Sequence, residues 1–120
     1  MLSLGMDIGT STVKLVLLRD GAMAKQWMAV HHGRPFACLK KGLSALELDA
    51  DTPFSLCVTG SNTEALLEQD SAIPSLGDIP AIVEGVRWII PQVGSVIEIG
   101  SQGARFITEV QSRTPQFAAN

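Results

Sequence analysis

The stretch "GMDIGTSTVKLVLLRDG", residues 5–21, decides which fold this chain is expected to adopt. It predicts a short apolar strand over residues 2–8, a return through Gly, Thr and Ser, and a second strand over residues 12–19. The second strand is β-branched and apolar on both faces, which is typical of a central strand covered on both sides. Asp20-Gly21 then predicts a type I′ turn, because that turn needs positive φ at both central residues.

Two more strands and three helices are predicted after these first two strands. A third strand over residues 22–30 completes an antiparallel meander, and Pro35 fits the first turn of a helix. The further predicted elements are a helix over 35–48, a strand in "FSLCVTG" at 54–60, a short helix over 62–69, and a longer helix that Asp78 caps and Pro91 ends. No low-complexity linker separates them, and the pattern indicates one α/β fold.

A second hairpin is predicted near the end of the chain, formed by "SVIEIG" and "ARFITEV" and joined by "GSQG". Its sequence repeats the first hairpin: a strand, an acid, Ile, Gly, a few small polar residues and another strand. "MDIGTST" in the first hairpin corresponds to "IEIGSQG" in the second. The final residues, "QSRTPQFAAN", show no periodicity, so no element is expected there.

Composition and charge exclude several classes of protein. The 120 residues are 46% apolar and 18% charged, a globular composition with enough length for one domain and its core. Nine Lys and Arg and a net charge of −3 argue against a nucleic-acid partner. No apolar run suits a transmembrane helix and no basic region precedes the first strand, so we expect a cytoplasmic protein without a membrane partner. Cys38 and Cys57 lack metal-ligand spacing and are interpreted as core residues.

The mouth of each hairpin combines a carboxylate with a glycine and hydroxyl side chains. Glycine allows backbone N–H groups to approach an anion, and successive amides in a tight turn form a nest for phosphate oxygens. Mg²⁺ is usually held by one or two carboxylates together with nucleotide phosphates. Asp7 and Glu98 fit that role, so the first hairpin predicts a phosphate cradle with a metal anchor.

The alternative interpretation is ordinary turn composition, since Gly, Ser and Thr are common between strands. The second copy of the pattern favours the phosphate site. The loop is neither a Walker-type loop nor a dinucleotide fingerprint, because a strand rather than a helix follows it. Lys14, four residues past Thr10, either faces the phosphates, which we favour, or is solvated at a sheet edge.

His31 and His32 follow the third predicted strand. We interpret them as imidazoles that form local hydrogen bonds at a strand end before the helix begins. Contact of one of them with a nucleotide or a partner protein is the alternative.

Longer motifs resemble one protein family. "DIGTSTVKLVLL" followed by a "DG" turn resembles the first phosphate motif of the actin, Hsp70 and sugar-kinase ATPase superfamily. "HHGRP" at 31–35, "VTGS" at 58–61 and "DIPAIVEGVRWIIPQVGSVIEIGSQGARFI" at 78–107 follow it, an order that resembles the BadF/BadG/BcrA/BcrD family. That family includes the ATP-dependent activators of 2-hydroxyacyl-CoA dehydratases and the ATPase subunits of benzoyl-CoA reductase.

The resemblance implies an RNase H-like, actin-like ATPase fold, with a first lobe at residues 1–92 and the opening hairpin of a second lobe plus a tail at 93–120. It implies ATP and Mg²⁺ as ligands, with Asp7 and Glu98 in catalytic roles and Asp7 holding Mg²⁺ through water. Gly60 would allow a close backbone turn near the nucleotide. The residues implied to cradle the phosphates are Gly9, Thr10, Ser11 and Thr12 and, from across a cleft, Gly100, Ser101 and Gln102.

Activators of this family are homodimeric iron–sulfur proteins that couple ATP hydrolysis to the injection of a low-potential electron into a dehydratase. The resemblance therefore implies a homodimer and an acyl-CoA dehydratase or reductase partner. The family's cluster cysteines follow the second motif and neither Cys38 nor Cys57 matches them, so a [4Fe-4S] cluster is expected only in a complete protein. Because a cleft needs both walls, we expect this chain alone to bind ATP poorly and to lack ATPase activity.

Several positions depart from the family pattern. Glu98 stands for the usual Asp, Ser101 for a Gly, Gly103 for an acid and Arg105 for a Lys. The loss of the acid at 103 removes a metal or water ligand, which puts hydrolysis in question. A non-catalytic lobe that binds a partner is therefore one alternative. A carbohydrate kinase lobe is another, although no sugar-contacting base is evident.

Overall fold

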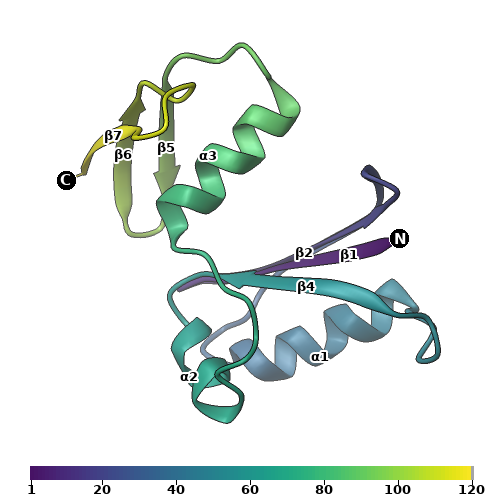
Figure 1. The fold of residues 1–120 in the computed structure, drawn as a ribbon. Coiled ribbons are helices and arrows are strands. Elements are labelled where there is room, and N and C mark those ends of the chain that lie inside the picture. Colours follow the sequence, from purple (N-terminus) through teal and green to yellow (C-terminus); the bar gives the residue numbers. More distant parts are fainter. Residues whose placement is uncertain (120) are drawn as a thin grey trace. The chain divides into compact units, whose positions relative to one another are not determined.

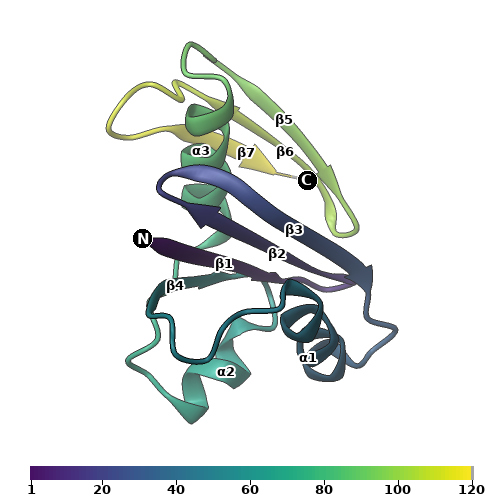
Figure 2. The ribbon, with the colours of Figure 1, turned by 90° about the vertical axis from the view of Figure 1, so that its right-hand side faces the viewer.

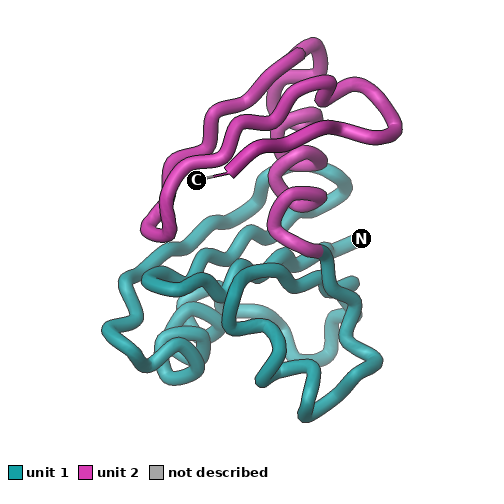
Figure 3. The backbone as a smooth tube through the Cα atoms, turned by 90° about the vertical axis from the view of Figure 1, so that its left-hand side faces the viewer, with its two compact units in different colours: residues 1–76 teal, residues 77–120 magenta. Residues whose placement is uncertain are grey.

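The computed structural model describes residues 1–119, which form two compact units. The first unit is Met1–Leu76 and the second begins at Gly77 (Figure 3). Each unit has its own β-sheet and its own apolar core. No helix within residues 1–119 is long and apolar enough to cross a membrane.

The first unit is built on a four-stranded sheet in the order β3-β2-β1-β4 (Figure 2). Pairing of β1 with β2 and of β2 with β3 is antiparallel, and β4 is parallel to β1, so the predicted meander extended by a further strand is confirmed. The β2–β3 turn has φ of 51° at Asp20 and 78° at Gly21, as the predicted type I′ turn requires. The strands are β1 (Leu2–Ile8), β2 (Thr12–Arg19), β3 (Ala22–Val30) and β4 (Phe54–Thr59).

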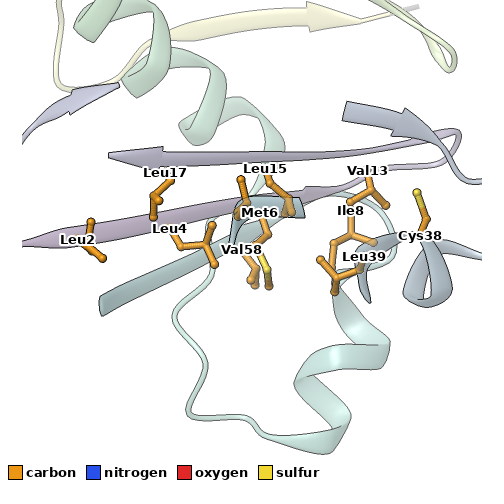
Figure 4. Packing of buried hydrophobic residues seen from close by; sticks show 11 residues of the cluster. Leu2, Leu4, Met6, Ile8, Val13, Leu15, Leu17, Cys38, Leu39 and Val58 are labelled. Carbon is orange, nitrogen blue, oxygen red and sulfur yellow. The ribbon is translucent and has the colours of Figure 1, made fainter. Parts of the chain in front are cut away.

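Helices α1 (Pro35–Leu46) and α2 (Thr63–Gln69) cover one face of this sheet (Figure 1). Alternate side chains of β1 and β2 point to that face and pack with Val58 of β4 and Leu39 of α1 (Figure 4). Val16 and Leu18 of β2 point to the opposite face and are half-buried. The sequence predicts that both faces of β2 are covered. Helices α1 and α2 cover one of them.

Helix α1 packs closely on the sheet at Gly42. A Cβ at this position would lie 2.5 Å from Trp27 Cε3 of β3 and 2.7 Å from Leu15 Cδ1 of β2. The helix ends at Leu46 rather than at residue 48, because Glu47 adopts the left-handed conformation with a φ of 52°.

The second unit packs helix α3 (Asp78–Ile89) on a three-stranded antiparallel sheet in the order β5-β6-β7. The strands are β5 (Val96–Gly100), β6 (Gly103–Thr108) and β7 (Gln116–Ala119). The predicted β5–β6 hairpin is confirmed. Strand β7 is absent from the sequence prediction, because its four residues are all exposed and carry no alternation; pairing with β6 determines it.

Asp78 is the first residue of α3 and not its cap, so the predicted cap is wrong. Gly77 occupies the cap position and no side chain caps the helix there. The Asp78 carboxylate instead accepts a hydrogen bond of 3.2 Å from Arg105 on β6. The helix ends just before Pro91, as predicted.

The two units divide between Leu76 and Gly77, so α3 packs with the strands that follow it. The sequence interpretation sets the lobe boundary between residues 92 and 93. That boundary refers to a complete two-lobed protein and stays a prediction.

Candidate functional site

The candidate site lies in the first unit, where β1 and β4 end. These strands are parallel neighbours, so their carboxyl ends reach the same edge of the sheet. The turn over residues 9–11 follows β1, and the turn over residues 60–62 follows β4. Ligands of open α/β sheets bind outside the carboxyl ends of the strands, so a binding site is expected at this edge.

Gly60 brings the two turns together. Its φ is +107°, and a Cβ there would lie 2.4 Å from the Ile8 carbonyl oxygen. The Asn62 N–H donates to that same oxygen at 2.9 Å, and the Thr10 and Ser61 hydroxyls are hydrogen-bonded at 2.9 Å. The close backbone turn expected at Gly60 is therefore present, while the proximity of Gly60 to a nucleotide stays a prediction.

Asp7 and Lys14 form an acid–cation pair beside these turns. The two residues face each other across β1 and β2, with Lys14 Nζ 3.6 Å from Asp7 Oδ2 and both side chains partly exposed. Strand β2 is an inner strand of the sheet and Lys14 is half-exposed on it, so the favoured orientation of Lys14 toward phosphates stays a prediction. A phosphate bound here would have both a cation and a carboxylate nearby.

Gly9 leaves space between the turn and the Asp7 carboxylate. A Cβ at Gly9 would lie 3.6 Å from Asp7 Oδ1 and 3.2 Å from the Thr12 carbonyl oxygen. Thr10, Ser11 and Thr12 add three hydroxyl side chains to the same turn. This donor set fits a phosphate whose Mg²⁺ is held by one carboxylate and waters. Among residues 1–119, no three His, Cys, Asp or Glu side chains converge as a protein-only metal site.

The second unit repeats the acid–cation pair. Glu98 faces Arg105 across β5 and β6, with Arg105 Nε 3.7 Å from Glu98 Oε2. Arg105 also donates to Asp78 at 3.2 Å, so one guanidinium lies between two carboxylates. The carboxylate predicted for Mg²⁺ in this hairpin therefore already has a cationic neighbour from its own unit.

The turn of the second hairpin is shorter than that of the first. Gly100 pairs with Gly103, which leaves Ser101 and Gln102 as an exposed two-residue turn. A Cβ at Gly100 would lie 3.0 Å from Glu98 Oε1, so the absence of a side chain leaves room for that carboxylate.

The predicted site residues fall into two groups, one in each unit. The first unit brings together the larger group: Asp7, Gly9, Thr10, Ser11, Thr12, Lys14 and Gly60. Strand β5 and its turn carry the rest: Glu98, Gly100, Ser101 and Gln102. The expectation that the two groups face each other across a triphosphate stays a prediction.

Comparison with known proteins identifies the fold of this chain. No family model matches the chain. Over 105 residues it is 27% identical to the uncharacterized protein YjiL of Escherichia coli (strain K12), a match that covers 88% of this chain and 40% of that protein. Component A of the Acidaminococcus fermentans (R)-2-hydroxyglutaryl-CoA dehydratase matches with a TM-score of 0.79 and 21% identity, over 98% of this chain and 47% of that one.

A second solved structure is the activator of the 2-hydroxyisocaproyl-CoA dehydratase from Clostridium difficile with bound ADPNP. It matches with a TM-score of 0.77 and 21% identity, over 100% of this chain and 46% of that one. The chain has the actin-like ATPase fold. The predicted α/β architecture is therefore confirmed, and the chain spans less than half the length of these relatives. The BadF/BadG/BcrA/BcrD family stays a prediction.

Three residues that hold the first turn in place are missing from the predicted site: His31, Ser61 and Asn62. The predicted local bond of His31 is present, because its Nδ1 accepts from the Gly33 N–H at 3.1 Å, yet its Nε2 also reaches the Gly9 carbonyl oxygen at 2.9 Å. Ser61 could have been found from the "VTGS" motif. No spacing in the sequence signals the contact between residues 9 and 31.

Cys38 and Cys57 lie on opposite sides of the first unit's sheet. Cys38 is buried against the helix-covered face of the sheet, with its Sγ 4.0 Å from the Ala29 carbonyl oxygen. Cys57 is half-buried and precedes the core residue Val58 on β4, so its side chain points to the opposite face. The interpretation as a core residue is confirmed for Cys38 and holds only in part for Cys57.

Proposed function

We propose that the chain is the N-terminal part of an ATP-binding activator ATPase. In this proposal the complete protein energises electron transfer to a 2-hydroxyacyl-CoA dehydratase or a related reductase. The fold shared with two proteins of dehydratase systems, one of them an activator with bound ADPNP, supports the class of protein. The observation that carries the proposal is the joining of the turns after β1 and β4 beside the Asp7–Lys14 pair.

Each predicted site residue of the first unit has its own role in this proposal. Gly9 lets the phosphate approach the backbone of the turn, Thr10, Ser11 and Thr12 donate backbone or hydroxyl hydrogens to phosphate oxygens, and Lys14 offsets their charge. Asp7 would hold Mg²⁺ through water, and the ion would supply positive charge to neutralise the phosphates. Gly60 keeps the second turn close enough to close this side of the site.

In the second unit, Gly100, Ser101 and Gln102 are proposed to contact phosphate, and Glu98 is proposed as a second catalytic carboxylate. The homodimer, the acyl-CoA dehydratase or reductase partner and the [4Fe-4S] cluster belong to the complete protein in this proposal. A second cleft wall is also expected from there, because a nucleotide site needs burial on both sides.

Calorimetric titration of the chain with Mg-ADPNP tests the nucleotide site. The matched variants are Asp7→Asn and Asp51→Asn, which remove equal charge from the site and from the exposed loop after α1. We expect weak Mg²⁺-dependent binding in wild type and in Asp51→Asn, reduced about tenfold or more in Asp7→Asn, because a contact to a charged group contributes about 1.5–3 kcal/mol. Chelation of Mg²⁺ should abolish the difference in affinity between wild type and Asp7→Asn.

Two results would contradict the proposal. One is absence of binding by wild type at millimolar nucleotide. The other is unchanged ATP turnover when Asp7→Ala is made in the complete protein of this proposal.

A non-catalytic lobe that binds a partner is the second candidate. The ion pairs of Arg105 favour this non-catalytic candidate. The Arg105 guanidinium pairs with both Glu98 and Asp78, so it would compete with a metal for the Glu98 carboxylate. Tight association with another chain, together with no heat on addition of Mg-ADPNP, would support this candidate over the first.

A further inference from the structure

His31 is a buried imidazole at the end of β3, with 6% of its surface exposed. Its Nδ1 lies 3.1 Å from the backbone N–H of Gly33, which can only donate. The ring nitrogen facing that N–H must therefore be the acceptor, so the ring proton is on Nε2. From there it donates to the Gly9 carbonyl oxygen at 2.9 Å. The surroundings thus select one neutral tautomer and use both ring nitrogens.

The same carbonyl oxygen has a second donor. Asn62 Nδ2 lies 2.8 Å from Gly9 O, and the amide must present its NH₂ group there because a carbonyl only accepts. Both lone-pair positions of this oxygen are therefore used. The two donors come from segments that follow different strands, β3 and β4, so they converge only in the folded unit.

These bonds determine the direction of one peptide group in the turn. The peptide between Gly9 and Thr10 is planar and trans, so its N–H points away from its C=O. With the carbonyl drawn toward His31 and Asn62, the Thr10 N–H is directed to the other side of the peptide. Two further bonds hold the turn, Gly9 N–H to Thr12 O at 2.9 Å and His31 N–H to Ser11 O at 3.0 Å.

We propose that His31, with Asn62, is a positioning residue that sets the polarity of the phosphate turn. A flipped Gly9–Thr10 peptide would present its carbonyl oxygen to the ligand and repel a phosphate, whereas the anchored peptide presents an N–H. The role rests on the proposed function, because it concerns the same site. It also explains the "HHGRP" motif, since its first histidine holds the turn after β1 from a distance of 22 residues in sequence.

Two substitutions separate the two bonds of His31. In His31→Gln the side-chain Nε2 takes the place of the ring Nε2 and keeps the donor to Gly9. In His31→Asn the side-chain Oδ1 takes the place of the ring Nδ1, which keeps the acceptor for Gly33 but loses the bond to Gly9. Each variant loses one hydrogen bond, so similar thermal stability is expected of both. His32→Asn is the control, since His32 is exposed and Asn tolerates its φ of 50°.

The test uses NMR on the ¹⁵N-labelled chain, first without ligand and then during titration with Mg-ADPNP. Without ligand, the ring ¹⁵N shifts of His31 should report the Nε2–H tautomer, and the Thr10 amide shift should change in His31→Asn but little in His31→Gln. With ligand, we expect affinity to fall about 3- to 10-fold in His31→Asn, the range of one hydrogen bond, and to stay within about 2-fold of wild type in His31→Gln and His32→Asn. A purely structural role would weaken binding in both His31 variants alike.

Several outcomes would overturn the proposal. If His31→Asn binds as tightly as wild type, or if the two His31 variants bind equally, the positioning role is wrong while the nucleotide site stands. An Nδ1–H tautomer would overturn it without any ligand. If wild type does not bind at all while the ligand-free shifts are as expected, the proposed function fails, and the role in phosphate binding fails with it.

Discussion

A Cβ at Gly60 would lie 2.4 Å from the carbonyl oxygen of Ile8, closer than real Cβ atoms approach a backbone oxygen. The backbone of the turn after β4 therefore reaches the end of β1 only because residue 60 has no side chain. Everything proposed for the site depends on this approach, since it brings Ser61 and Asn62 to the turn that follows β1.

Gly60→Ala should destabilise the first unit and separate the two turns. The left-handed φ of +107° and the clash with backbone together should cost about 2–4 kcal/mol in free energy of unfolding. Urea denaturation measures this cost. Gly21→Ala is the control: its φ is +78° but nothing lies within 4 Å of the added Cβ, so it should lose only about 1 kcal/mol. Equal losses in the two variants would contradict the close approach.

Two helical glycines should respond differently to alanine, because only Gly85 has room for a side chain. Gly42→Ala places a methyl group 2.5 Å from the Trp27 ring, and the overpacking of about 1–3 kcal/mol should offset or exceed the gain in helix propensity. At Gly85 of α3 nothing lies within 4 Å, so Gly85→Ala should stabilise by about 0.5–1 kcal/mol. Thermal unfolding of both variants checks the difference, and a stabilising Gly42→Ala would show that α1 does not pack against Trp27 as described.

The isoleucines that follow the two acids differ in their surroundings although their motifs correspond. Ile8 is fully buried, whereas Ile99 is 81% exposed. Ile8→Ala should therefore cost about 2–5 kcal/mol in free energy of unfolding, and Ile99→Ala about 0.5 kcal/mol or less. Denaturant unfolding followed by circular dichroism measures both. A large loss in Ile99→Ala would mean that this side chain is covered in solution.

The ion pair between the N-terminal amino group and Asp20, at the β2–β3 turn, should make the stability of the fold depend on pH. Its hydrogen bond of 2.6 Å to Asp20 Oδ1, together with its charge, lowers the pKa of Asp20 below the ordinary value. A carboxyl with a lowered pKa in the folded state stabilises the fold above its unfolded pKa, and this contribution is lost as pH falls through the folded value. Asp20→Asn should remove that part of the acid dependence, and an NMR titration of the Asp20 carboxyl carbon should give the lowered pKa. An unshifted titration would contradict the pair.

Local patterns carried most of the fold prediction. The meander and its Asp20-Gly21 turn depend on alternation and on one dipeptide, so they can be read within a short window. Strand β7 could not be found in this way, because Gln116–Ala119 becomes a strand only through pairing with β6. Asp78 has the residue type of a cap, yet Arg105 engages its carboxylate from another element.

The candidate site also contains residues that local sequence predicts and residues that only tertiary contacts reveal. The Gly9–Thr12 turn and the neighbouring Asp7 are continuous in sequence, and residue type alone indicates their chemistry. The anchoring of that turn by His31 and Asn62 depends on the tertiary approach of three segments, and no motif spacing encodes it. The residues proposed to bind phosphate were therefore predictable from sequence, whereas the residues that orient them were not.

A crystal structure of the chain with Mg-ADPNP tests the central claim most directly. The account predicts a phosphate within hydrogen-bonding distance of the Thr10 N–H and of hydroxyls in the Gly9–Thr12 turn, with Mg²⁺ linked to Asp7 through water. Density for the triphosphate elsewhere on the molecule, or a Thr10 N–H turned away from it toward a protein acceptor, would contradict the account.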